Sequence, residues 1–112
     1  MAVVDALRAG CAQGWLWTHI PNGEERDKRV AAKLQRMGVQ PGWPDLLLIG
    51  PEGMVHGLEL KRVKGGHLNK AQQAFATACQ GRAVLYAVAK GAEEAIAILR
   101  MWGALRRLRV SA

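Results

Sequence analysis

The chain has 112 residues, a length that fits one small domain, so residues 1–112 are expected to fold as a single unit. Sixteen Lys and Arg against nine Asp and Glu give a net charge of +7 and a pI near 10.1, which favours an anionic partner such as nucleic acid. The two cysteines lack metal-ligand spacing, which argues against a zinc finger and against a disulfide-rich secreted protein. No apolar run approaches the roughly 20 residues that cross a membrane, and no secretion signal is recognisable. The reducing cytoplasm is therefore the expected location.

The N-terminal part predicts a short helix followed by a strand. Residues 1–12 place apolar side chains at spacings of three and four, which is typical of a helix with one buried face. Residues 14–20 are aromatic and β-branched and predict a strand, which Pro21-Asn22-Gly23 ends with a turn. Asp5 is the only acid before Glu24, and the favoured interpretation is an exposed residue of the first helical turn that interacts with the helix dipole.

The next segment, residues 24–37, predicts a basic helix that ends at Gly38. Its apolar face consists of Val30, Leu34 and Met37. A solvated charged surface and a contact with a phosphate backbone are equally good interpretations of the basic stripe beside that face. Like charges at neighbouring helical positions repel one another, and a polyanion would remove that repulsion. The stripe contains Arg26, Arg29, Lys33 and Arg36.

The central segment predicts a β-hairpin with an unusual set of polar residues. Asp45 precedes an unbroken apolar run, residues 46–49, which is the pattern of a buried strand. A Gly/Pro turn at residues 50–53 leads into a second strand, in which alternation places Glu59 and Lys61 on one face. Pairing of the two strands would bring Asp45 and the Glu59/Lys61 pair to the same end of a sheet.

Two carboxylates and one amine at such close range suit phosphodiester hydrolysis. Neighbouring carboxylates repel each other unless a hard divalent cation such as Mg²⁺ lies between them. The ammonium group can assist deprotonation of a water molecule and offset the negative charge that develops on a phosphate. The alternative is an ordinary exposed Glu/Lys pair on an antiparallel strand, which contributes about 0–1 kcal/mol and needs no metal.

A basic loop over residues 63–68 leads into a third predicted helix over residues 69–80, for which Asn69 is a good N-cap. His67 in this loop is a candidate contact to phosphate, although a lone loop histidine usually has no specific role. The simplest interpretation of Gln72 is a polar residue on the helix surface. The residues expected to pack on the sheet are Ala71, Ala74, Phe75, Ala78 and Cys79.

The remaining elements are interpreted as scaffold. Residues 82–89 predict another apolar strand, and residues 92–102 predict a helix that packs through its apolar face. The basic tail, residues 105–110, is compatible with a DNA contact, a short edge strand or disorder. Together the elements predict an α/β domain in the order α-β-α-β-β-α-β-α, with a small mixed β-sheet flanked by helices.

Several motifs in order along the chain resemble a nuclease superfamily. Pro44-Asp45, Glu59-Leu60-Lys61 and a following Gln72 are similar to the PD-(D/E)xK nucleases. Within that superfamily, the chain resembles the VRR-NUC (virus-type replication-repair nuclease) family from about His19 to about Gly91. The additional motifs are His19-Ile20-Pro21-Asn22-Gly23, residues 31–39 and Pro41-Gly42-Trp43-Pro44-Asp45-Leu46.

The resemblance implies a restriction-endonuclease-like core and a Mg²⁺- or Mn²⁺-dependent DNA endonuclease. In that family pattern Asp45 and Glu59 bind the metal, and the Leu60 backbone carbonyl is a further oxygen ligand. Lys61 assists the nucleophilic water and offsets the phosphate charge, and Gln72 positions the water.

Further implications concern the substrate and the assembly. The resemblance puts His19 and Asn22 near the active site or the phosphate backbone, whereas residue chemistry alone favours an edge-strand polar residue and a turn former. Stand-alone members resemble phage-encoded nucleases that act on branched DNA, of Holliday-junction or flap type, which implies a homodimer in a bacterial or phage-infected cell. The family usually has a metal-site glutamate in its first helix, and this chain has none before Glu24. A non-catalytic nucleic-acid-binding module that lacks this glutamate is therefore one alternative. The small size and the four tryptophans make a subunit of a larger replication or repair assembly another.

Overall fold

The computed structural model describes residues 1–21 and 28–107. The described residues confirm the predicted element order, although the start predicted for the second helix lies outside them. The four helices and four strands are α1 (Ala2–Gly10), β1 (Leu16–His19), α2 (Lys28–Arg36), β2 (Leu46–Ile49), β3 (Val55–Lys61), α3 (Lys70–Gln80), β4 (Val84–Lys90) and α4 (Ala92–Trp102).

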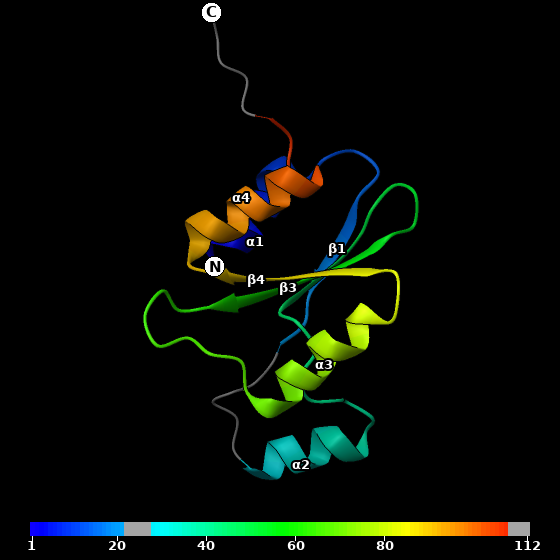
Figure 1. The fold of residues 1–112 in the computed structure, drawn as a ribbon, viewed down its shortest axis with the longest axis vertical. Coiled ribbons are helices and arrows are strands. Elements are labelled where there is room, and N and C mark those ends of the chain that lie inside the picture. The colour runs from blue at the N-terminus through cyan, green and yellow to red at the C-terminus, as the bar shows by residue number, and fades with distance from the viewer. Residues whose placement is uncertain (22–27, 108–112) are drawn as a thin grey trace, which may run out of the picture.

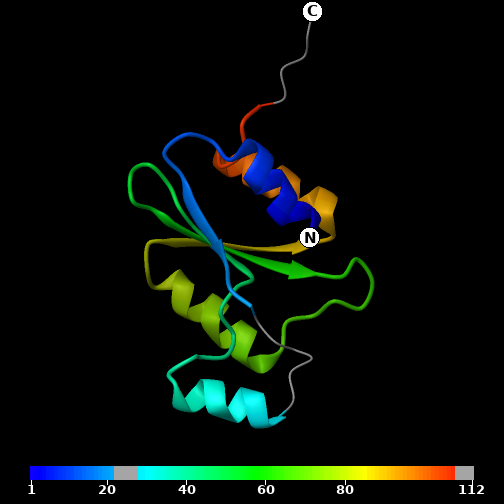
Figure 2. The same ribbon diagram turned by 180° about the vertical axis from the view of Figure 1, so that it is seen from behind.

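A mixed sheet with the strand order β1-β2-β3-β4 lies between two layers of helices (Figure 1). The pairs β1–β2 and β2–β3 are antiparallel, and β3–β4 is parallel, with α3 as the crossover that a parallel pair requires. Helices α1 and α4 cover one face of the sheet, α3 covers the other, and α2 lies beyond α3 (Figures 1 and 2). None of the described helices is long and apolar enough to cross a membrane.

The hairpin between β2 and β3 is closed by the predicted turn. The N–H of Gly53 donates to the carbonyl of Gly50 at 2.9 Å, and Gly53 has a φ of 89°, which favours glycine. The resulting register pairs Leu46 with Leu58. Asp45, the residue before Leu46, therefore lies opposite Glu59, the residue after Leu58.

The hydrophobic core lies on the face of the sheet that α1 and α4 cover. Side chains from β2 and β3 point to this face and meet the apolar stripes of the two helices, and burial of each large side chain contributes about 1.5–3 kcal/mol. The most deeply buried of these residues are Val3, Leu7, Leu46, Leu48, Leu58, Ala95 and Leu99.

The same core contains one buried histidine. The ring of His56 lies between Trp15 and Trp102, with ring centroids at 4.8 Å and 4.9 Å. Its Nδ1 is 3.0 Å from the carbonyl oxygen of Met54. Burial lowers the pKa of His56 below its ordinary value, an effect that the hydrogen bond to Met54 partly offsets.

Helix α3 is rotated relative to the sequence-based prediction. Ala74 and Ala78 were expected to pack on the sheet and are instead exposed. The face that approaches the sheet contains Gln72, Phe75 and Cys79, at spacings of three and four. The prediction for the two alanines is wrong because the polar Gln72 takes part in the inward face.

Helix α2 has no buried residue in its described range, and its predicted apolar face is largely uncovered. Val30 is 45% exposed and Met37 is 69% exposed, while Leu34 is half-buried. An isolated nine-residue helix is marginally stable in water, so this element depends on further contacts for its stability.

Candidate active site

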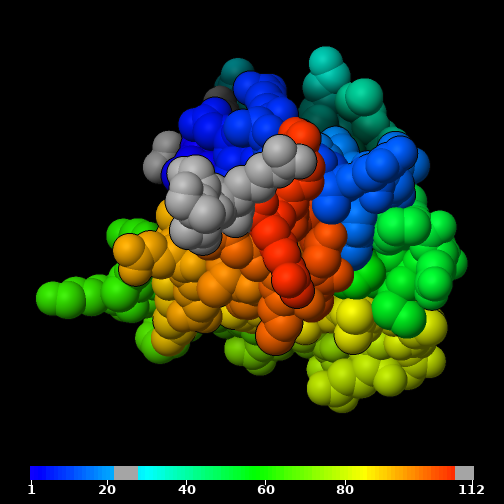
Figure 3. All heavy atoms as spheres, turned by 90° about the horizontal axis from the view of Figure 1, so that it is seen from above, coloured from blue at the N-terminus to red at the C-terminus, as the bar shows by residue number. Residues whose placement is uncertain are grey.

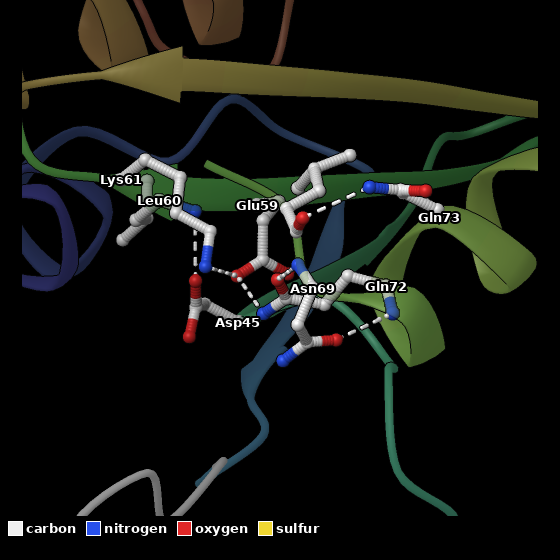
Figure 4. Close-up of polar contacts among 8 residues, drawn as sticks. Asp45, Glu59, Leu60, Lys61, Asn69, Gln72 and Gln73 are labelled. Carbon is white, nitrogen blue, oxygen red and sulfur yellow. Dashed lines mark hydrogen bonds and ion pairs between the residues drawn. The ribbon is translucent and has the colours of Figure 1, made fainter. Parts of the chain in front are cut away.

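Asp45, Glu59 and Lys61 converge at one end of the β2–β3 pair, on the face covered by α3 (Figure 4). The Oδ2 atom of Asp45 accepts a hydrogen bond of 2.7 Å from the backbone N–H of Leu60. The N–H of Ile20, which follows β1, donates to the Asp45 carbonyl at 2.7 Å. The backbone at the entrance of β2 is thus bound to the residue after β1, and the Asp45 carboxylate is oriented by the backbone of β3.

Glu59 is a buried carboxylate with two polar neighbours. The residue is 1% exposed, and its Oε1 accepts a hydrogen bond of 3.2 Å from Nε2 of Gln72. The ammonium nitrogen of Lys61 lies 3.9 Å from the same oxygen, and the Lys61 side chain is 10% exposed. A buried charge is stable only with such compensation. The interpretation of Glu59 and Lys61 as an ordinary solvent-exposed pair is therefore wrong.

Gln72 is oriented by the N-terminal cap of α3. Its backbone N–H donates to Oδ1 of Asn69 at 2.9 Å, and its Oε1 accepts a 2.9 Å hydrogen bond from the N–H of Asn69. This reciprocal capping box uses the amide oxygen of Gln72 and turns the amide nitrogen to Glu59. Gln72 is 3% exposed, so the prediction of a surface glutamine is wrong. The spacing of Asn69 and Gln72 was a sequence signal for this role.

The loop before Asp45 is fixed on α3 by two contacts. Gly42 has a φ of 89°, and a side chain at this position would collide with the carbonyl of Ala71. Trp43 packs against Phe75 of α3, with ring centroids 4.9 Å apart. The Gly-Trp pair of the motif therefore attaches the entrance of β2 to α3, the helix that provides Gln72.

Pro44 and Gly57 set the position of Asp45 relative to the sheet. Pro44 is fully buried, and a β-carbon on Gly57 would lie only 3.0 Å from its Cγ. Gly57 pairs with Tyr86 of β4, and the Tyr86 ring lies on the Phe75 side of the sheet, with ring centroids 5.8 Å apart. Burial, together with the charge of Glu59, raises the pKa of Tyr86 to about 12. Nothing in the sequence pattern had singled out Tyr86.

The other predicted contacts do not all reach this site. His19 pairs with Leu46, so strand alternation directs its side chain to the face of α1 and α4, away from Asp45. Asn22 and Arg26 lie outside the described residues. The remaining candidates are exposed: His67 lies in the loop after β3, and α2 carries Arg29, Lys33 and Arg36.

The donor chemistry of the site fits a hard divalent cation. Asp45 and Glu59 supply two carboxylates, and Mg²⁺ typically binds one or two protein carboxylates while it keeps several waters and binds substrate phosphates. No group of three or more His, Cys, Asp or Glu that could hold a metal occurs in the part of the chain that the structure describes. Asp5 does not join the two carboxylates, because α1 covers the opposite face of the sheet and the Asp5 side chain is 73% exposed to solvent (Figures 1 and 2).

Comparison with known proteins identifies a structural relative. No protein-family model matches the chain, and no curated protein sequence matches it significantly. A solved structure described as a VRR_NUC domain protein is similar, with a TM-score of 0.63 and 26% sequence identity over 80% of this chain and 68% of that chain. The fold, the converging residues and this likeness agree with the motif resemblance. The fold and motifs of the chain therefore resemble those of the VRR-NUC family, and the likeness supports a nuclease-type domain with a restriction-endonuclease-like fold.

Proposed function

We propose that this domain is a Mg²⁺- or Mn²⁺-dependent DNA endonuclease. The observation that carries the proposal is the buried Glu59, which lies beside Lys61 and Gln72 and opposite Asp45. Even with polar partners, a buried carboxylate contributes little to stability, so its place at this position favours a chemical role. Two carboxylates with an ammonium group beside them supply the charges that phosphodiester hydrolysis needs.

Each residue of the site has a distinct proposed role. Asp45 and Glu59 would hold the metal, with the Leu60 carbonyl as a further ligand, and the ion would polarise the phosphoryl group. Lys61 directs its ammonium group to the reacting centre, where it orients the attacking water and offsets charge on the scissile phosphate. Gln72 holds the Glu59 carboxylate in position and, as a neutral amide, does not compete for the proton.

The surface charge supports DNA as the substrate. The exposed Arg29, Lys33 and Arg36 of α2 would contact the phosphate backbone, and the predicted stripe extends to Arg26. His67 would contribute on the loop after β3. Asn22 and His19 are kept as secondary backbone contacts, His19 at the edge of the sheet rather than beside the carboxylates. The proposed DNA contacts are therefore His19, Asn22, Arg26, Arg29, Lys33, Arg36 and His67.

We further propose a homodimer that cuts branched DNA of junction or flap type. The uncovered apolar residues Val30 of α2 and Met37 just after it support an additional protein contact. Two active sites related by a twofold axis would cut two strands symmetrically. The same uncovered surface would serve a subunit of a larger replication or repair assembly.

One observation favours a second candidate, a nucleic-acid-binding module without catalysis. The only acid of α1 is exposed and does not join Asp45 and Glu59. A metal held by two protein carboxylates is bound less tightly than one held by three. The basic surface would then bind DNA without cleaving it.

Cleavage assays test the proposal directly. Labelled linear, flapped and four-way-junction DNA would be incubated in Mg²⁺, Mn²⁺ or EDTA with the wild type, Lys61→Ala and the control Lys90→Ala. Lys90 pairs with Lys61 on the neighbouring strand and is exposed, so its loss should leave cleavage unchanged. Metal-dependent cleavage that disappears with Lys61→Ala supports the nuclease. Tight, salt-sensitive binding with no cleavage in any metal supports the binding module.

A further inference from the structure

A groove of about 580 Å³ lies beyond Lys61, between the end of β3 and the start of α3. Its polar walls are formed by Lys61, Arg62, His67 and Asn69, together with the backbone of Gly65 and Gly66. Lys61 and Arg62 have basic side chains, and none of the described residues that line the groove is acidic. A concave surface with this lining favours an anion.

The shape of this groove depends on the close packing of Gly66. Gly66 is buried, and a β-carbon on it would lie 2.5 Å from the carbonyl oxygen of Arg62 and 2.9 Å from the β-carbon of Lys61. Only glycine therefore allows the loop to turn back against the end of β3. From the other side, the N–H of Gly91 donates to the Lys61 carbonyl at 2.9 Å. The loop projects from the body of the domain (left in Figure 3), yet its base is held at Lys61 and Arg62.

The groove shares one wall with the proposed active site. The Lys61 ammonium group faces Glu59 at 3.9 Å, and Asn69 at the far wall accepts the hydrogen bond that positions Gln72 (Figure 4). A DNA strand with one phosphate at the carboxylates would place its next phosphate close by along the strand. The groove is the adjoining surface that offers positive charge and hydrogen-bond donors.

We propose that this groove is a subsite for the phosphate next to the scissile phosphate, and this inference rests on the proposed nuclease function. The Arg62 guanidinium offers five N–H donors in a planar arrangement that suits phosphate oxygens. The imidazole of His67 and the side-chain amide of Asn69 add donors at the rim. The enzyme would then require a phosphate on the neighbouring nucleotide, so its substrate is an internal phosphodiester rather than an isolated one.

Two substrates separate this subsite from the catalytic centre. Thymidine 5′-(p-nitrophenyl) phosphate contains one phosphodiester without a neighbouring phosphate, whereas DNA contains both. With Arg62→Gln, kcat/KM for DNA should fall about tenfold, and that for the small diester should stay within about twofold. Arg100→Gln removes an exposed charge on α4, on the other side of the sheet, and should change neither. Equal losses on both substrates, or no loss on DNA, would overturn the subsite.

A binding experiment keeps the test independent of cleavage. Thymidine 3′,5′-bisphosphate would be titrated in EDTA while the backbone amide signals of the protein are followed by NMR. The subsite predicts shifts at Gly65, Gly66 and His67, and about tenfold weaker binding with Arg62→Gln. Shifts confined to other surfaces, or unchanged affinity in the variant, would overturn it. Binding at the groove by a protein that cleaves no DNA would refute the nuclease and preserve the anion site.

Discussion

The two faces of the sheet are built on different principles. The face under α1 and α4 is an apolar layer in which Leu46, Leu48 and Leu58 are fully buried. The face under α3 contains a buried carboxylate, Glu59, and a buried amide, Gln72, beside the half-buried rings of Phe75 and Tyr86. In such a small domain one face must supply most of the stability, which allows the other to bury charge for chemistry. This difference between the faces predicts that substitutions under α1 and α4 mainly change stability, whereas those under α3 mainly change activity.

Replacement of Glu59 by glutamine should have the largest effect on function and little effect on stability. The amide keeps the shape of the side chain but removes the buried charge, so kcat for DNA cleavage should fall about a hundredfold to a thousandfold. The amide oxygen of the glutamine can still accept hydrogen bonds from Lys61 and Gln72, and the carboxylate's desolvation penalty is removed, so the free energy of unfolding should change by no more than about 1 kcal/mol. Cleavage assays and urea unfolding would be compared on one preparation. A loss of several kcal/mol would show that this face is also essential for stability.

The opposite outcome is expected for Leu58→Ala on the apolar face. Loss of a fully buried leucine should lower the free energy of unfolding by about 2–5 kcal/mol, through lost burial and the cavity that remains. Leu85→Ala is the matched control, because Leu85 lies on the neighbouring strand and is 44% exposed. Urea denaturation measures both variants. Similar losses in the two would contradict the concentration of stability under α1 and α4.

Gln72→Ala should moderately lower both the stability of the domain and its rate of DNA cleavage. The substitution removes half of the capping box and the hydrogen bond to Glu59, so it should lower stability by about 1–2 kcal/mol and slow cleavage. Gln73→Ala is the adjacent control: its side chain is exposed and donates a hydrogen bond to the Leu68 carbonyl, away from Glu59. If the two alanine variants have equal thermal stability and activity, the proposed link between the cap and the site is wrong.

The buried His56 makes the apolar face sensitive to acid. Its folded-state pKa is lowered by burial, so the unfolded chain binds a proton more readily. Stability from this residue is complete above its ordinary pKa of about 6.5 and declines as the pH falls from there through the folded-state pKa. Urea unfolding between pH 7.5 and 5.5 would be compared with that of His56→Phe. The wild type should lose more stability than the variant over this interval, and parallel curves would exclude His56 as the cause.

Tyr86→Phe should give the smallest change. The Tyr86 hydroxyl is buried and has no hydrogen-bond partner among the described residues. Removal of such a group should leave stability unchanged or raise it by up to about 1 kcal/mol. Thermal unfolding is the measurement, with Phe75→Leu as a comparison that disturbs the ring packing instead. A clear loss of stability in Tyr86→Phe would point to a bound water or another partner for the hydroxyl.

Much of the fold followed from local patterns. The order of the elements, the 50–53 turn and the N-cap at Asn69 depend on short-range periodicity and turn chemistry, which neighbouring residues determine. The convergence of Asp45 with Glu59 also followed, because a short hairpin leaves few possible registers. The face of β1 that His19 occupies was not predictable, because it depends on pairing with a distant strand.

The sequence by itself determined which chemistry the chain carries: two carboxylates and an amine on a hairpin, in a basic domain with VRR-NUC motifs. The tertiary structure decided which of these groups are buried and how they are held. Glu59 is buried because α3 packs over its face of the sheet, and Gln72 faces it because the Asn69 cap fixes the rotation of that helix. Burial and rotation arise from contacts between elements far apart in the chain, which no local pattern records.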